Sequence, residues 1–368
     1  MKKNILLTPG PANTSDIVKQ ALIIDDICPR EKEFWLLTKK VSEWLLDIIN
    51  ANYSDYVCVL LWWSWTLAME SVITSLPNVN DKILIIENWA YWKRFKDIAN
   101  VYNIDYLSLD YERWKPILLE DVEKKLSEND IKYVFFTHME TTTWILNNLR
   151  KINKVIHKYW AISVVDAMSS FWGYPIDANL DEIDFLISSS NKCIGWMPWI
   201  SFVIWKRKII ESLSSNPIRS YYSNLYLQYK YFEDNLQFRF TPPVQIVYSL
   251  KAAIEELKKE WWAKKRYERY TKNYELLKQW LKELWFRFLL EEEFESKILI
   301  TVLEPKWFDF EEFHDEVKKY WITIYPWKLN TRVKSFRLSV LWNLYEDDIN
   351  YVIDVFKKVL KNKEIKYD

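Results

Sequence analysis

Glycine is almost missing from this chain, and its scarcity restricts the available folds more than any other feature. The 368 residues include 3 glycines and 22 tryptophans, whereas an average content of about 7% would give about 26 glycines. Tight turns and helix ends commonly use glycine, because it adopts positive φ angles at little steric cost. The glycines and tryptophans together number 25, which is close to an ordinary glycine content.

Several tryptophans stand where turn chemistry favours glycine. Trp63 and Trp65 flank a serine where an expected strand ends and a helix begins, while Trp144 and Trp327 follow a threonine run and a proline. The Cβ of tryptophan makes positive φ costly. We therefore hypothesise that the gene uses UGA as a glycine codon that the printed sequence translates as tryptophan. Literal indoles at Trp63, Trp65 and Trp144 should then be crowded against backbone or forced outward. The alternative is an aromatic chain that is simply poor in glycine.

The first two thirds of the chain alternate apolar, β-rich runs with segments of helical periodicity. This alternation predicts an α/β fold, in which helices cover both faces of a mostly parallel sheet. The expected strands span residues 56–61, 82–86, 104–109, 133–137, 162–166 and 184–188, and the clearest helices span 67–76, 93–102 and 149–159.

The last third has a different pattern. A long amphipathic helix over 243–284, interrupted at residues 261–262, leads into an expected smaller α+β domain. Its expected elements are strands 297–303, 322–325 and 335–340 and helices 309–320 and 346–361. We expect a large domain over residues 1–245, including a substrate-loop segment over 1–30, and a connecting helix with a small domain over 246–368.

Charge and cysteine content exclude several classes of protein. Lys+Arg and Asp+Glu number 51 each, so no basic excess favours nucleic acid or an anionic membrane as a partner. The apolar run at residues 5–7 is too short for a signal peptide, and no run reaches the roughly 18 residues of a membrane span. The three widely spaced cysteines and three histidines fit neither a disulfide framework nor a metal site. We expect a cytoplasmic protein without a metal.

Three features at strand ends carry the chemistry. Asp166 ends one expected strand, and Lys192 follows the Ser-Ser-Ser-Asn run after the next. With tryptophan read as glycine, residues 63–66 become Gly-Ser-Gly-Thr at a helix start, where free N–H groups suit a phosphate. A lysine, a carboxylate and an anchored phosphate are what pyridoxal phosphate requires. Taken singly, Asp166 could be a helix cap and Lys192 a surface lysine.

At these positions the sequence resembles the class V aminotransferases of fold type I, and within them most closely the 2-aminoethylphosphonate:pyruvate transaminase group. The resemblance covers nearly the whole chain, and most family glycines in the matching stretches are tryptophan here. The stretches are residues 6–11, 27–31, 64–66 with 68–70, 88–92, 138–144, 165–171, 190–193, 237–243 and 324–329.

The resemblance implies pyridoxal 5'-phosphate as cofactor and a homodimer with shared active sites. Lys192 matches the lysine that bonds to the cofactor and shuttles a proton, and Asp166 matches the carboxylate that keeps the pyridine nitrogen protonated. The other implied cofactor contacts are Ser64, the backbone at Trp65 and Thr66 at the phosphate, Tyr91 on the ring, Thr141 at the ring hydroxyl, and Thr241 from the neighbouring subunit. Tyr91 could instead pack within a helix, and Thr241 could simply start one.

For the substrates, the resemblance implies that Arg337 clamps the carboxylate of pyruvate or alanine through its two-pronged guanidinium. Arg337 could alternatively form a structural ion pair. Arg30 is a second cation near the matching motifs, and Gly10 lies in the substrate-loop segment. Pro29 stands where the family has histidine, and Gly195 and Ser201 also depart from its pattern, so the donor-binding loop differs from that of the family.

The implied reaction transfers the amino group of 2-aminoethylphosphonate to pyruvate, which gives phosphonoacetaldehyde and L-alanine. An alanine- or serine:glyoxylate-type aminotransferase would share the lysine, aspartate and arginine. A cysteine desulfurase or other lyase is disfavoured, because Asn191 rather than histidine precedes Lys192. If the tryptophans are literal, a non-catalytic relative is the third alternative. The sequence leaves open whether the phosphonate is degraded or made.

Overall fold

A seven-stranded sheet dominates the computed structural model, which describes residues 3–87, 93–111, 115–140, 145–260, 262–326, 334–341 and 343–361. The strand order is β2-β8-β7-β6-β5-β3-β4, and all neighbours are parallel except β8, which is antiparallel to both β2 and β7. The strands are β2 (Tyr56–Trp62), β3 (Ile83–Glu87), β4 (Tyr106–Asp110), β5 (Tyr133–Thr137), β6 (Ile162–Asp166), β7 (Phe185–Ser189) and β8 (Ile200–Lys206).

Six of these strands confirm the sequence prediction to within two residues at each end, whereas β8 was missed. β8 follows β7 without an intervening helix and returns antiparallel to it. A βαβ rhythm predicts only parallel strands. The apolar run Ile-Ser-Phe-Val-Ile-Trp over residues 200–205 was nevertheless a strand signal.

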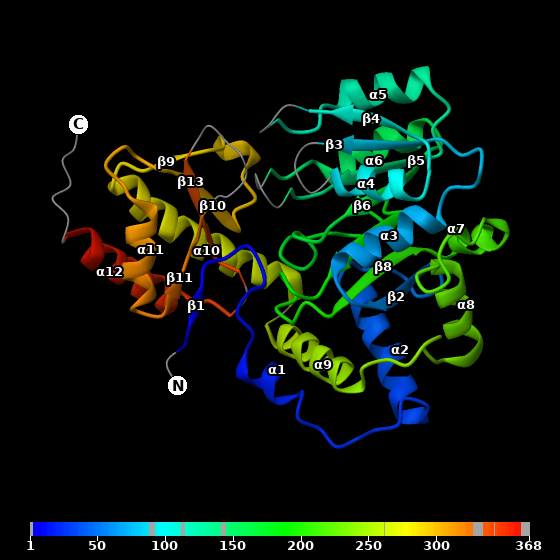
Figure 1. Ribbon diagram of the computed structural model, residues 1–368, viewed down its shortest axis with the longest axis horizontal. Coiled ribbons are helices and arrows are strands. Elements are labelled where there is room, and N and C mark those ends of the chain that lie inside the picture. Colours follow the sequence, from blue (N-terminus) through cyan, green and yellow to red (C-terminus); the bar gives the residue numbers. More distant parts are fainter. Residues whose placement is uncertain are drawn as a thin grey trace.

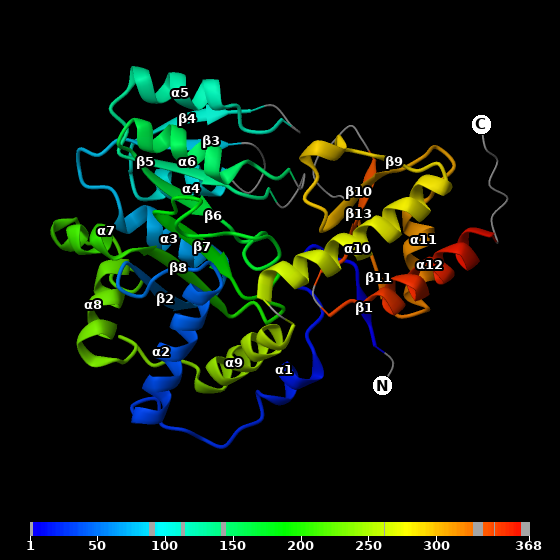
Figure 2. The same ribbon diagram turned by 180° about the vertical axis from the view of Figure 1, so that it is seen from behind.

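Helices cover both faces of this sheet, as Figures 1 and 2 show from opposite sides. One face packs against α2 (Lys32–Asp47), α5 (Leu119–Glu128), α6 (Leu149–Lys158) and α9 (Val244–Lys259). The other face packs against α3 (Trp65–Ser75), α4 (Lys93–Val101), α7 (Arg207–Ser212) and α8 (Leu225–Asn235). Successive strand residues enter opposite cores: Val57 and Val59 face α3, whereas Cys58 and Leu60 face α2. This two-sided burial explains why the strands are continuously apolar.

The carboxyl ends of the strands meet at one edge of the sheet. β2 is parallel to β7, because both are antiparallel to β8. The turn before α3, the end of β6 at Asp166 and the turn after β7 therefore lie at the same edge. In parallel sheets this edge carries the binding site.

The C-terminal part forms a separate four-stranded antiparallel sheet of order β12-β13-β10-β9. Its strands are β9 (Arg287–Phe288), β10 (Leu299–Leu303), β12 (Tyr325–Pro326) and β13 (Ser335–Ser339), and its helices are α10 (Trp262–Glu283), α11 (Phe310–Lys318) and α12 (Glu346–Lys361). The chain also contains the short helix α1 (Asp16–Gln20) and two 3₁₀ turns (Leu213–Ser215 and Glu292–Phe294). The predicted helix interruption is confirmed, since α9 ends at Lys259 and α10 begins at Trp262.

The N-terminal segment contacts both the C-terminal part and the turn that carries Lys192. β1 (Ile5–Leu6) pairs in parallel with β11 (Ile322–Thr323) of the C-terminal part. A few residues later, the N–H of Ala12 donates to the carbonyl of Asn191, 3.4 Å away, beside Lys192. The domain boundary at residues 245–246 stays a prediction. It falls within the first turn of α9, which begins at Val244 and packs against α1 and α2. None of the helices in the described ranges is long and apolar enough to cross a membrane.

Tryptophan has positive φ angles unusually often in this structure. Within the described residues, ten non-glycine residues have positive φ, and five of them are Trp63, Trp160, Trp172, Trp285 and Trp321. Trp63 has φ 108° and its side chain is exposed, which confirms the expectation of an indole forced outward there. The same expectation is wrong for Trp65, which begins α3 without a positive φ and packs under the guanidinium of Arg94, whose Cζ lies 4.0 Å from the ring centre. Trp144 lies outside the described residues.

A buried aspartate at the opposite edge of the large sheet holds three elements together. Asp184 accepts hydrogen bonds from the N–H of Ser163 at 3.0 Å, from His157 Nε2 at 2.6 Å and from Lys206 Nζ at 2.8 Å. Burial alone would raise the pKa of Asp184, but the hydrogen bonds and charges of His157 and Lys206 hold it below its ordinary value. Its carboxylate therefore stabilises the fold at neutral pH.

Replacing Asp184 with asparagine is expected to lower the free energy of unfolding at pH 7 by about 2 kcal/mol. This is less than a fully buried pair would lose, because Lys206 is partly exposed. Since the folded-state pKa of Asp184 is depressed, its contribution is present above the unfolded pKa of about 4 and is lost as the pH falls. Urea unfolding at pH 7 and pH 3.5 measures both effects. Asp105→Asn, at an exposed site before β4, should change stability by less than about 0.5 kcal/mol.

Candidate active site

Lys192 and Asp166 line the same cavity at the carboxyl edge of the large sheet. The cavity has a volume of about 100 Å³. Its lining residues are Pro9, Gly10, Trp65, Asp166, Met168, Asn191 and Lys192. The strand-end argument therefore brought the predicted lysine, carboxylate and helix start together correctly. Pro9, Met168 and Asn191 were not singled out from the sequence as site residues.

The Lys192 amine is buried and hydrogen-bonded within the protein. Its Nζ donates to Ser169 Oγ at 2.8 Å. Burial lowers the pKa of Lys192 to about 8, although the negative charges of Asp166 and Glu140 oppose this shift. A substantial fraction of the amine is therefore neutral at slightly alkaline pH and can accept a proton or attack a carbonyl carbon. The surface-lysine alternative is wrong.

The three glycines of the chain lie against Lys192 or against its neighbour Cys193. Gly10 has φ 144°, and a Cβ there would lie 3.4 Å from Lys192 Cγ. The N–H of Gly195, at φ 73°, donates to the Lys192 carbonyl at 2.9 Å. A Cβ at Gly173 would lie 2.4 Å from the sulfur of Cys193. Close approach or positive φ thus accounts for each glycine.

Asp166 is a buried carboxylate at the end of β6. Its Oδ1 accepts the N–H of Met168 at 2.7 Å. Burial raises the pKa of Asp166 to about 6, while the Met168 hydrogen bond and the charge of Lys192 pull it down. The group is therefore mostly ionised at pH 7, and it can pair with a cation in the cavity. It does not cap a helix, because no helix follows it directly.

The start of α3 presents polar groups beside the cavity. Ser64 is the exposed N-cap residue and makes no side-chain capping hydrogen bond. Thr66 Oγ1 accepts a hydrogen bond from Arg94 Nη1 at 3.2 Å. The free N–H groups of a helix start, together with an arginine, are favourable for an anion. Arg94, on α4, was missed from the sequence, although it follows the matching stretch 88–92 by only two residues.

Other predicted site residues lie around this centre or outside it. Arg337 is buried on β13, with its Cζ 5.3 Å from the Tyr325 ring centre, and its charge lowers the pKa of Lys192. Arg30 is exposed and donates to Gln237 Oε1 at 2.6 Å. Thr241 is exposed and does not line the cavity. Tyr91 and Thr141 lie outside the described residues.

Cys193, which follows Lys192, is not placed as a nucleophile. Its Sγ donates to the carbonyl of Ser169 at 3.3 Å. Burial raises the pKa of this thiol to about 12, so it remains protonated. Since the thiolate is the reactive form of cysteine, Cys193 is inert in this conformation.

His138 is held within the protein by local contacts. His138 Nδ1 lies 2.9 Å from Ser170 Oγ, and burial lowers the pKa of the ring to about 4. His138 is therefore a neutral, structural histidine that supports the segment carrying Ser169. Over the part of the chain that the structure describes, no three His, Cys, Asp or Glu side chains group as metal ligands.

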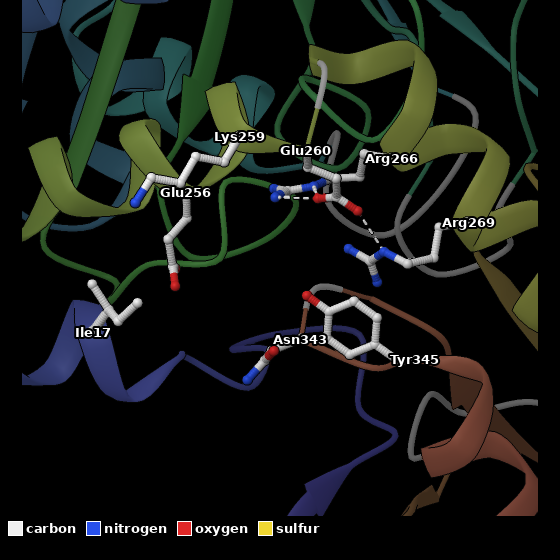
Figure 3. Close-up of a pocket in the computed structure, with 8 residues that line it drawn as sticks. All are labelled: Ile17, Glu256, Lys259, Glu260, Arg266, Arg269, Asn343 and Tyr345. Carbon is white, nitrogen blue, oxygen red and sulfur yellow. Dashed lines mark hydrogen bonds and ion pairs between the residues drawn. The ribbon is translucent and has the colours of Figure 1, made fainter.

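A larger cavity of about 350 Å³ lies between α1, α9, α10 and the segment before α12, and Figure 3 shows its lining. In that view Arg266 and Arg269 both point toward the carboxylate of Glu260, with nitrogen–oxygen distances of 2.7 and 2.5 Å. Arg266 Nη1 also donates to the carbonyl of Cys193 at 3.0 Å. These charges are engaged within the protein, so the cluster supports the turn that carries Lys192.

Comparison with known proteins agrees with this geometry. The model of the Aminotransferase class-V family matches residues 30–315. A 2-aminoethylphosphonate--pyruvate transaminase from Bacillus cereus (strain ATCC 10987 / NRS 248) is 36% identical over 357 residues, which cover 96% of this chain and 97% of the relative.

Among solved structures, an alanine--glyoxylate aminotransferase from Nostoc sp. superposes with a TM-score of 0.89 at 22% identity, over 98% of this chain and 96% of that one. A ureidoglycine-glyoxylate aminotransferase from Bacillus subtilis gives a TM-score of 0.89 at 18% identity, over 100% and 95%. These likenesses show the fold. The chain belongs to the class V aminotransferase family of fold type I, whose members use pyridoxal 5'-phosphate.

Proposed function

We propose that this aminotransferase moves the amino group of 2-aminoethylphosphonate to pyruvate and so forms phosphonoacetaldehyde and L-alanine. The observation that carries the proposal is the 36% identity to transaminases of that name, over 96% of the chain. The joint lining of one cavity by Lys192 and Asp166 supplies the chemistry that such a reaction needs. The expected cytoplasmic location stays a prediction.

The residues present fit pyridoxal 5'-phosphate chemically. Lys192 offers an amine for the aldehyde, Asp166 a carboxylate for the pyridine nitrogen, and the start of α3, with Ser64 and Thr66, an anion site. Tyr91 and Thr141 remain proposed ring contacts. The space is narrow, since about 100 Å³ is below the roughly 300 Å³ of a small ligand pocket, and the Trp65 side chain is part of the wall.

When bound, the cofactor supplies an electron sink for the carbon that loses a proton. Lys192 Nζ, with its pKa lowered to about 8 by burial, would take this proton from the substrate carbon that bears the amino group. It would then deliver the proton to the cofactor carbon that receives the nitrogen. The Asp166 carboxylate would balance the positive charge of the protonated pyridine nitrogen. The N–H of Met168 keeps the Asp166 carboxylate oriented and ionised.

Arg337 is the proposed carboxylate-binding residue for pyruvate and alanine. Arg337→Lys should raise the KM for pyruvate by about tenfold or more with a smaller change in kcat, because a lysine keeps the charge but loses the two-pronged geometry. Steady-state kinetics with varied pyruvate measures the effect. Arg287→Lys, an exposed substitution in the same sheet, should leave both constants unchanged. An equal response of the two variants would remove Arg337 from the proposal.

A homodimer with Thr241 reaching the neighbouring subunit's phosphate site is part of the proposal. Thr241 is exposed on the single chain, which leaves it available to a second copy. Sedimentation of the holoprotein should give twice the mass of one chain. Thr241→Ala should weaken cofactor retention without changing that mass.

The substrate proposal is tested by amino-donor and acceptor profiles. Purified holoenzyme with 2-aminoethylphosphonate and pyruvate should form alanine at a kcat/KM at least about 100-fold above that of alanine with glyoxylate. The alternative, an alanine- or serine:glyoxylate-type enzyme, predicts the reverse ratio. Activity with glyoxylate and none with the phosphonate would sink the proposal.

Cys193→Ala is expected to retain at least about half of the transaminase activity, because the buried thiol stays protonated and points to a backbone carbonyl. Some stability, on the order of 1 kcal/mol, is lost with the sulfur atom. Coupled alanine assays and thermal unfolding measure the two. A chain that released sulfide from free cysteine, and lost this activity in Cys193→Ala, would instead be a desulfurase.

A further inference from the structure

Three of the tryptophans at positive φ occupy equivalent local positions, two or three residues after a helix ends. Trp160 follows α6, Trp285 follows α10 and Trp321 follows α11. Their φ angles are 61°, 62° and 63°. In each case the N–H donates at 3.0 Å to the carbonyl three residues earlier. This left-handed position after a helix is the one that glycine occupies most often.

The indoles at these helix ends contribute little packing to offset their backbone strain. The exposed fractions of Trp160, Trp285 and Trp321 are 92%, 78% and 52%. A left-handed conformation places Cβ too close to the following carbonyl, whatever the rest of the side chain does. A large apolar side chain in water gains nothing in return. The backbone therefore fits glycine and the exposed side chain gives no reason for tryptophan.

The other two positions show the same mismatch in different surroundings. Trp63, at φ 108° and 60% exposed, precedes the N-cap of α3. Trp172, at φ 76°, is fully buried, and its Nε1 is a buried donor with no hydrogen-bond partner. Trp172 also lies next to Gly173 in the turn against Cys193. Both indoles do contact other side chains, Trp63 the ring of Trp199 and Trp172 the guanidinium of Arg266, but these contacts leave the positive φ angles in place.

We propose that positions 63, 160, 172, 285 and 321 are glycine in the protein that the native host makes, because the host reads UGA as glycine. The composition argument and the φ angles are independent, since one counts residues and the other locates them. Of the other five positive-φ residues, Asn50 and Asn103 are of a type that tolerates this conformation. Tryptophan is the one residue type that is both in excess and concentrated there.

Trp65 gives this reading a consequence for the active site. Its φ is not positive, yet its side chain walls the cavity that holds Lys192 and Asp166. If the same codon is read as glycine at position 65, the indole is absent and the backbone of α3 forms that side of the cavity. The first turn of α3 would then face a wider cavity. This consequence concerns the same site as the proposed function, but the codon proposal itself does not depend on any activity.

Mass spectrometry of the protein isolated from its native host is the direct test. Peptides that contain positions 63, 160, 172, 285 and 321 should each have the mass of the glycine form. Tryptophan at these positions would overturn the proposal. Because the readout is a peptide mass, an enzyme inactive on the phosphonate could still confirm the codon, and an active enzyme could still refute it.

A recombinant comparison tests the backbone argument separately. At each of the exposed positions 160, 285 and 321, Trp→Gly and Trp→Ala both remove the indole, but only glycine removes Cβ. The folded-to-unfolded ratio should be about tenfold higher for each glycine variant than for its alanine counterpart. Trp44, within helix α2, is the matched control, and there Trp→Ala should be the more stable variant. Alanine equal to glycine at all three helix ends would contradict the assigned conformations.

Discussion

Lys192→Ala is expected to lower kcat for transamination by at least about 1,000-fold, because it removes both the bond to the cofactor and the proton carrier. No other lysine lines the cavity in the described part of the chain. The buried amine has its pKa lowered to about 8, so the lost group is one tuned for proton transfer near neutral pH. Alanine formation from 2-aminoethylphosphonate and pyruvate, or from whichever donor proves best, measures the loss.

Two controls separate a catalytic role for Lys192 from a structural one. Lys82→Ala changes an exposed lysine just before β3, away from the cavity, and should leave kcat unchanged. Added ethylamine should partly restore the activity of Lys192→Ala by acting as a free base. Thermal unfolding should show a folded variant, since burying an uncharged methyl group costs less than burying an amine. Retention of more than about a tenth of the activity would contradict the role.

Asp166→Asn is expected to lower kcat by about 100- to 1,000-fold, because the amide cannot balance a positive charge in the cavity. The substitution keeps the shape of the side chain. The negative charge of Asp166 opposes the lowering of the Lys192 pKa, so its removal should move that pKa further below 8. The change in the Lys192 pKa is measured from the pH dependence of Lys192 acylation by an amine-reactive acylating reagent. A purely structural aspartate would not produce this change.

Asp184→Asn is the matched control, because both aspartates are buried next to strands of the same sheet. Asp166→Asn should change stability at pH 7 by no more than about 1 kcal/mol. The reason is that burial raises the pKa of Asp166 to about 6, so its ionised form adds no stability to the fold at pH 7. Asp184→Asn should instead lose stability and keep kcat. If both variants lost stability and activity alike, Asp166 would be a structural residue.

Strand positions were predictable because buried parallel strands are short apolar runs with their own boundaries. The meeting of Asp166 and Lys192 followed from the shared edge of parallel strands. β8 was missed because nothing in its composition indicates that the chain returns without a helix. Ser169 and Arg94 were missed for another reason. Their roles depend on which side chains the folded chain places at 2.8 and 3.2 Å from Lys192 and Thr66.

For the tryptophans, the sequence raised the question and the structure located the affected positions. Composition identified an anomaly but could not rank its positions. The φ angles pick out five sites within the described residues, whereas Trp65 turned out to be helical and packed against Arg94. From the sequence, Trp63 and Trp65 had been treated alike. The structure shows that Trp63 has the strained backbone, whereas Trp65 has a helical backbone and its side chain narrows the cavity.

The N-terminal segment connects the C-terminal part of the chain to the cavity that contains Lys192. At one end, the N–H groups of Ile5 and Leu7 donate to the carbonyls of Trp321 and Thr323 at 2.8 and 2.9 Å. At the other end, Pro9 and Gly10 form part of the cavity wall against Lys192. With so few residues between the two attachments there is almost no slack. Any displacement of the C-terminal part that carries β11 must therefore move Pro9 and Gly10 with it or break the β1–β11 pairing. The volume around Lys192 thus depends on the position of that part.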